Sequence, residues 1–217
     1  MRLLPRASTP IGLDLGAHTI RAAQADQSGS VITSAALTRA TPDTPVSAEE
    51  LEHFRGVLYR QGFIGRTAFV ALPKSILMRT TIELPPKDSG APTLDIARSE
   101  IARQAKADPG SFEFALWDAP QPPKHGGSSR AIGVGCSHSD ATGLISAIES
   151  TNLKVAGLFT PSTALAASLT PPQQGSTLAA VDIGWTDSTF ILIGHGAIVF
   201  ERQFGGCGVG AFVARLA

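Results

Sequence analysis

The chain has 217 residues, of which 43% are hydrophobic and 17% are charged, and its formal net charge is zero. This length and composition indicate a globular protein of one large or two small domains. The balanced charge argues against a nucleic-acid-binding protein and a polybasic membrane anchor, and no apolar stretch approaches the roughly 20 residues that cross a bilayer, so we expect no direct membrane insertion.

The first segment is expected to form a β-meander followed by a helix, after a flexible N-terminus over residues 1–10. Apolar runs separated by turn residues predict strands at 11–15, 19–25 and 31–37. Ser47 and Glu50 have the spacing of a helix capping box, and the stripe that follows them predicts a helix with one apolar face, formed by Leu51, Phe54 and Leu58. A buried strand at 68–72 should close this segment before Pro73.

The next block, residues 73–160, has another order of elements and is interpreted as an inserted subdomain. The pattern predicts strands at 78–84, 112–117 and 131–136 and helices at 93–105 and 140–151. Residues 121–129 are rich in Pro, Gly and Ser, and are predicted to be an exposed loop. A helix and a linker are expected over 161–175.

The last segment, residues 176–217, repeats the first. Strands are predicted at 177–183, 188–193 and 197–203, with a helix from Val209 to Ala217. The first turn of each segment has the form apolar-Asp-apolar-Gly, in Leu13-Asp14-Leu15-Gly16 and in Val181-Asp182-Ile183-Gly184. One Asp-x-Gly turn between strands is common, but two copies that each open a meander place the same chemistry at the same turn twice.

This chemistry suits a nucleoside triphosphate. Glycine at a turn lets backbone N–H groups approach phosphate oxygens closely, and hydroxyl groups nearby can add donors. Asp14 and Asp182 would hold Mg²⁺, mostly through water, because Mg²⁺ keeps much of its hydration shell. Gly205 and Gly206 either form a nucleotide loop or shape a strand-to-helix turn, and the sequence leaves both open. No general base can be named, so the catalytic residues stay unknown.

Paired hairpins of this kind resemble the actin, hexokinase and DnaK-type chaperone superfamily. Within it the chain is similar to PilM proteins of type IV pilus assembly, with FtsA as a relative, over the residues already quoted and over 71–75, 79–85 and 200–206. The resemblance implies an α/β fold with an RNase H-like actin core whose first part is residues 11–72. Residues 73–160 would be an inserted subdomain of the 1C type, and residues 176–217 would start subdomain 2A, so that the second lobe is truncated.

The same resemblance implies a nucleotide site. Its candidate residues are Asp14, Gly16, Ala17, His18, Thr19, Arg21, Asp182, Gly184, Trp185, Thr186, Ser188, Gly205 and Gly206. PilM-like proteins have small hydroxyl residues and a lysine where this chain has His18 and Arg21. They also continue to a later glycine-rich adenosine motif, so we expect the chain as given to bind ATP weakly, whereas its parent would bind ATP with Mg²⁺.

The implied function is a cytoplasmic scaffold at the inner membrane, held there by a partner. The partner would be a short N-terminal peptide of a PilN-like membrane protein, in a groove of the inserted subdomain lined by residues from 78–84 and 132–136. Self-association is a further expectation, and turnover of ATP would be slow at most. Two alternatives remain: a nucleotide-free interaction module like the GspL proteins of type II secretion, and a small-molecule kinase of the same superfamily.

Overall fold

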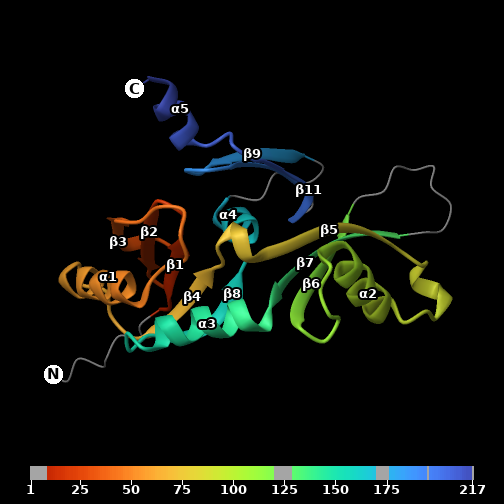
Figure 1. Cartoon of the computed structure of the whole chain (residues 1–217), viewed down its shortest axis with the longest axis horizontal. Helices are drawn as coiled ribbons and strands as arrows, with labels where there is room; N and C mark the ends of the chain where they lie inside the picture. Colours follow the sequence, from red (N-terminus) through yellow and green to blue (C-terminus); the bar gives the residue numbers. More distant parts are fainter. Residues whose placement is uncertain (1–8, 120–128, 170–175, 195, 217) are drawn as a thin grey trace.

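The structure is a computed structural model that describes residues 9–119, 129–169, 176–194 and 196–216 (Figure 1). Most of the N-terminus expected to be flexible, nearly all of the loop expected at 121–129, and the linker residues 170–175 lie outside the described residues. Within these ranges the chain forms three β-sheets, one of five strands and two of three strands.

The five-stranded sheet has the order β3-β2-β1-β4-β8. The meander predicted for the first segment forms its antiparallel half, and β4 and β8 continue it in parallel. The bounds of its strands are β1 (Ile11–Leu15), β2 (Thr19–Ala25), β3 (Val31–Thr38), β4 (Thr67–Ala71) and β8 (Lys154–Phe159).

Two helices, α1 (Ala48–Arg60) and α3 (His138–Glu149), contribute to the core of this sheet. The start of α1 is fixed by the predicted capping box, because the Ser47 hydroxyl accepts from the Glu50 N–H and the Glu50 carboxylate accepts from the Ser47 N–H. Ile11, Leu13 and Leu15 of β1 are buried in the same core. The buried face of β1 thereby fixes where the turn after it can lie.

The inserted unit is a sheet of order β5-β7-β6 with one helix packed on it. Its elements are η1 (Lys74–Ile76), β5 (Leu77–Leu84), η2 (Lys87–Ser89), α2 (Thr93–Ala105), β6 (Phe112–Ala119) and β7 (Ser129–Ser137). The core of this unit joins Ile82 and Leu84 of β5 to Ala97 and Ile101 of α2.

The inserted unit is smaller than the predicted range of 73–160. That range includes α3 and β8, but β8 pairs with β4 and α3 packs in the core of the five-stranded sheet, through Ile148. The reason is that the apolar side chains of β8, Val155 and Leu158, face the first core. The insertion proper therefore runs from β5 to β7.

The second lobe repeats the meander of the first as a sheet of order β11-β10-β9. Its elements are α4 (Pro161–Ser168), β9 (Thr177–Ile183), β10 (Ser188–Gly194), β11 (Ala197–Phe204) and α5 (Val209–Leu216). In Figure 1 this sheet lies above α4 and beside β5. Among the helices of the described residues, none has the length and apolar character needed to span a membrane.

Candidate functional site

The turns after β1 and β9 have the same backbone geometry. The N–H of Gly16 donates to the Thr19 carbonyl oxygen at 3.1 Å, and the N–H of Gly184 donates to the Asp187 carbonyl oxygen at 3.0 Å. A Cβ atom at Gly16 would lie 2.7 Å from the Thr19 oxygen, and one at Gly184 would lie 2.9 Å from the Asp187 oxygen. Both turns are therefore closed too tightly for any residue with a side chain.

The aspartates of the two hairpins occupy equivalent positions. Asp14 lies opposite Arg21 across the first hairpin, and Asp182 lies opposite Thr189 across the second. Asp14 accepts a hydrogen bond from the Arg21 guanidinium at 3.2 Å. In the second hairpin the cation comes from elsewhere, because Lys74 donates from Nζ to Asp182 at 2.7 Å and to the Thr189 hydroxyl at 2.8 Å. Each carboxylate thus has one cation beside it.

Both hairpins open onto one cavity of about 1140 Å³. Of the candidate residues, ten line it: Asp14, Gly16, Ala17, His18, Thr19, Arg21, Asp182, Gly184, Trp185 and Thr186. Burial holds the pKa of Asp14 above its usual value, although the Arg21 guanidinium opposes this shift and the charges of Asp182 and Lys74 have smaller effects. Asp14 and Asp182 line the same cleft.

The tips of the two hairpins touch. The rings of His18 and Trp185 stack with their centroids 3.8 Å apart and their planes 11° from parallel. His18 Nδ1 is buried and has no hydrogen-bond partner in the described part of the chain. Since both residues follow the glycines of the two turns, the contact closes the cleft where the sequence predicts phosphates to bind.

Three candidate residues lie elsewhere. Ser188 is buried and its hydroxyl donates to the Cys207 carbonyl oxygen, away from the cavity. Gly205 and Gly206 belong to the turn between β11 and α5, where Gly206 has a φ of +67° and donates from its N–H to the Asp187 carboxylate at 3.1 Å. These residues support the second hairpin from behind, which favours the strand-to-helix turn over a nucleotide loop.

Sequence reasoning missed Lys74 as a site residue. It follows β4, which runs parallel to β1 with Ala71 beside Asp14. Because parallel strands end at the same edge of a sheet, residues after β4 arrive next to the first hairpin. The parallel pairing of β1 with β4 would have been the signal, but the apolar pattern alone does not give strand partners.

Arg39 was missed as well, and it supports the first hairpin. Its side chain is buried and donates to the carbonyl oxygens of Ala17 and Pro45, each at 3.1 Å, and to the Glu50 carboxylate. Arg39 therefore ties the tip of the hairpin to the start of α1.

The expected peptide groove is corrected in part. Residues 132–136 lie in β7, the middle strand of its sheet, and they are buried, so they cannot line a groove. In β5 the side chains alternate, and only some of the expected lining, such as Thr81 and Glu83, is exposed.

The site has a composition that fits a triphosphate with a hydrated Mg²⁺. Two turns that admit only glycine face one cavity, and the Lys74 and Arg21 cations reach it beside two carboxylates. Phosphate oxygens would meet the cations and turn N–H groups, and water on Mg²⁺ would donate to the carboxylates. The His18–Trp185 contact would have to separate for this to happen.

No protein-family model matches the chain, and no curated protein matches it. Among solved structures it is similar to a chain of the PilM–PilN type IV pilus biogenesis complex, with a TM-score of 0.71 and 15% identity, over 97% of this chain and 65% of that chain. It is also similar to the cytoplasmic domain of EpsL, an inner membrane component of the type II secretion system of Vibrio cholerae. There the TM-score is 0.57 and the identity 15%, over 90% of this chain and 70% of that domain.

A third similar structure is a Bacteroides thetaiotaomicron protein with the actin-like ATPase fold, with a TM-score of 0.50 and 12% identity, over 99% of this chain and 78% of that one. The chain therefore has the actin-like ATPase fold, as its paired hairpins predict. It spans 65% of the length of the chain from the pilus complex.

Proposed function

We propose that this chain is a nucleotide-responsive scaffold of a type IV pilus or a related secretion machinery. It binds ATP with Mg²⁺ between its hairpins and the N-terminal peptide of a PilN-like inner-membrane protein, which holds it at the membrane. One observation carries the proposal: two equivalent Asp-x-Gly turns open onto one cavity, in a fold similar to that of the PilM–PilN complex.

The residues of the cleft have separate tasks in this function. Bound ATP with Mg²⁺ supplies a compact group of negative and positive charges. Lys74 and Arg21 would neutralise the phosphate oxygens, and Asp14 and Asp182 would accept hydrogen bonds from the water around the metal. Because the two hairpins belong to different lobes, a ligand that both contact favours one arrangement of the lobes and thereby changes the affinity for the partner.

The same cavity extends beyond the hairpins and supports the peptide role. There it is lined by apolar side chains from α3, α4, η1 and the segment before α1, which are Leu144, Ala147, Leu165, Ile76 and Val46. A short apolar peptide would bury its side chains against such a wall. This replaces the lining expected from 132–136, which is buried.

Nucleotide binding is tested through Trp185, which stacks on His18 at the hairpin tips. In a Trp117→Phe background Trp185 is the only tryptophan, so its emission reports on that contact. We expect Mg-ATP to change the emission with weak, millimolar-range affinity, because the stack must first separate. Lys74→Ala should weaken the affinity by about tenfold or more, through loss of a charge-assisted contact. Lys154→Ala, an exposed position on β8, is the control. An emission that ignores millimolar Mg-ATP would contradict the nucleotide role.

The nucleotide-free module is favoured by the same His18–Trp185 contact, which lies where the sequence predicts the phosphates to bind. A pull-down with a PilN-like N-terminal peptide, with and without Mg-ATP, distinguishes the scaffold, the nucleotide-free module and a kinase. The scaffold binds the peptide with an ATP-dependent affinity, and the nucleotide-free module binds it regardless of ATP. A kinase would ignore the peptide and phosphorylate a small molecule.

A further inference from the structure

Strand β5 has an open edge. It pairs with β7 along its whole length in an unbroken register, from Leu77 opposite Cys136 to Leu84 opposite Ser129. On its other side no strand of the described residues pairs with it. Every second residue of such a strand turns its N–H and C=O away from the sheet, and these groups can pair with an added chain.

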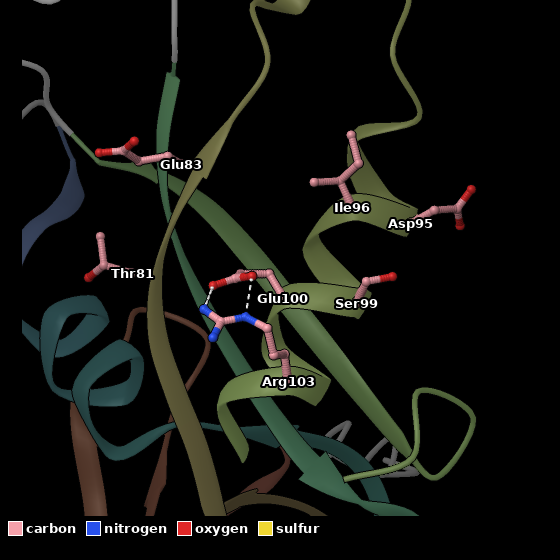
Figure 2. A pocket seen from close by; sticks show the side chains of 7 residues that line it. All are labelled: Thr81, Glu83, Asp95, Ile96, Ser99, Glu100 and Arg103. Carbon is pink, nitrogen blue, oxygen red and sulfur yellow. Dashed lines mark hydrogen bonds and ion pairs between the residues drawn. The ribbon is translucent and has the colours of Figure 1, made fainter. Parts of the chain in front are cut away.

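A groove runs along this edge between β5 and α2, with a volume of about 790 Å³ (Figure 2). We call it the β5–α2 groove. Thr81 and Glu83 project from the face of β5 that turns away from α2, and α2 contributes Asp95, Ile96, Glu100 and Arg103 on the other side of the strand edge. We call these two sets of side chains the walls of the groove. Ile82, between Thr81 and Glu83, points the other way and is buried against α2. An extended segment at the edge would therefore have one row of side chains on each wall.

The walls of the groove carry excess negative charge. Arg103 donates two hydrogen bonds to Glu100, from Nε at 3.0 Å and from a terminal nitrogen at 2.5 Å, as Figure 2 shows. These bonds hold the pKa of Glu100 at about 2, so the pair is ionised and self-neutralised. Glu83 and Asp95 are exposed, and neither has an ion pair or a hydrogen bond among the described side chains. One unpaired carboxylate is thus left on each wall.

We propose that the β5–α2 groove binds an extended, lysine- or arginine-bearing segment of a partner protein, which adds to β5 as an extra strand. The backbone groups of the open edge provide the affinity, and the two walls select the side chains. A basic residue meets Glu83 on one wall or Asp95 on the other, and an apolar residue packs on Ile96. This site lies outside the hairpin cleft, so it goes beyond the proposed function and does not depend on nucleotide.

The test uses the full chain and a fluorescein-labelled, acetylated seven-residue peptide of alternating lysine and valine, followed by anisotropy at low ionic strength. We expect saturable binding. Glu83→Lys or Asp95→Lys should weaken it by about fivefold to tenfold, according to which wall the lysines face, because each change removes an attraction and adds a repulsion. Glu52→Lys, an exposed position on α1, should leave it unchanged.

Two control peptides isolate the binding mode. The peptide with glutamate in place of lysine should not bind, because both walls are acidic. The lysine peptide with N-methyl groups on alternate backbone nitrogens keeps its charge but cannot donate to a strand edge, and it should bind at least tenfold more weakly. Three results would overturn the proposal. The methylated peptide could bind as tightly as the unmethylated one, the charge variants could bind the lysine peptide as tightly as the unchanged chain does, or the lysine peptide could fail to bind.

Discussion

At the scale of single residues, the two glycine turns are the most constrained positions of the cleft. Gly16→Ala places a Cβ atom 2.7 Å from a backbone oxygen, so the turn must shift. We expect a loss of about 1–3 kcal/mol in the free energy of unfolding, measured by urea denaturation. Gly12→Ala is the matched control, because its Cβ would meet the nearest atom, the Ala23 oxygen, at 3.6 Å. Similar losses for both variants would refute the tight closure of the turn.

Arg39 and Glu50 should make stability depend on pH. The Arg39 hydrogen bonds hold the pKa of Glu50 below its usual value, while burial opposes them. A carboxyl whose pKa is lower in the folded chain adds stability above its unfolded pKa, and this is lost as pH falls through the folded value. Glu50→Gln should therefore show a smaller loss of stability on acidification than the unchanged chain, by urea denaturation at several acidic pH values. An identical pH profile would contradict the assignment.

Removing the cation of this pair should cost more than removing its carboxylate. Arg39→Met leaves Glu50, whose side chain is only 12% exposed, without its partner, and frees the carbonyl oxygen of Ala17. We expect a loss of about 3 kcal/mol in the free energy of unfolding. In the double variant with Glu50→Gln the further loss from Arg39→Met should shrink, which a double-mutant cycle measures.

The sequence alone predicts the residues of the turns but not those that reach them from a distance. Asp14 and Asp182 were found because their motif repeats, and both line the cleft. Lys74 and Arg39 could not be found, since their roles follow from the parallel pairing of β1 with β4 and from the packing of the segment before α1.

At the scale of elements, α1 shows how a local signal fixes a helix start. Ser47→Ala removes the hydroxyl that accepts from the Glu50 N–H, so we expect a loss of about 1 kcal/mol. Ser34→Ala, an exposed position on β3, serves as the control. Thermal or urea unfolding of both variants gives the comparison, and an equal effect would mean that the cap does not stabilise the helix.

Elements with a strong local pattern were predicted, and one without such a pattern was not. The two meanders, α1 and α2 follow their apolar periodicity closely. β8 was missed because it has Gly157 in its interior, which weakens a strand signal. Its pairing with β4 is a tertiary contact, and this contact is what moves the boundary of the inserted unit.

At the scale of the whole molecule, a buried ion pair joins the inserted unit to the second lobe. Arg79 of β5 contacts the Glu201 carboxylate of β11, which also accepts from the Ser162 hydroxyl of α4 and is 1% exposed. Arg79→Met leaves this buried carboxylate without its cation, so we expect a loss of about 3–5 kcal/mol. Hydrogen exchange should quicken in β9, β10 and β11 and stay slow in β1 and β4. Arg60→Met, at the exposed end of α1, is the control. If exchange in β9, β10 and β11 were no faster in Arg79→Met than in this control, the ion pair would not stabilise the second lobe.

The relative placement of the lobes could not be read from the sequence. The repeat predicts two similar hairpins, but it does not state that they face each other. That arrangement rests on Lys74 meeting Asp182 and on Arg79 meeting Glu201, pairs that lie more than a hundred residues apart.

The shared backbone geometry of the two turns bears on how such chains diverge. A turn that offers main-chain N–H donors needs only a glycine and a neighbouring aspartate. Most residues around it can therefore be substituted without a change in the shape of the turn. The chain is in this position, because its similarity to the chain from the pilus complex has a TM-score of 0.71 at 15% identity, while no family model matches it. When this chain is compared with others of the same fold, the paired turns therefore give a more specific point of likeness than overall residue identity does.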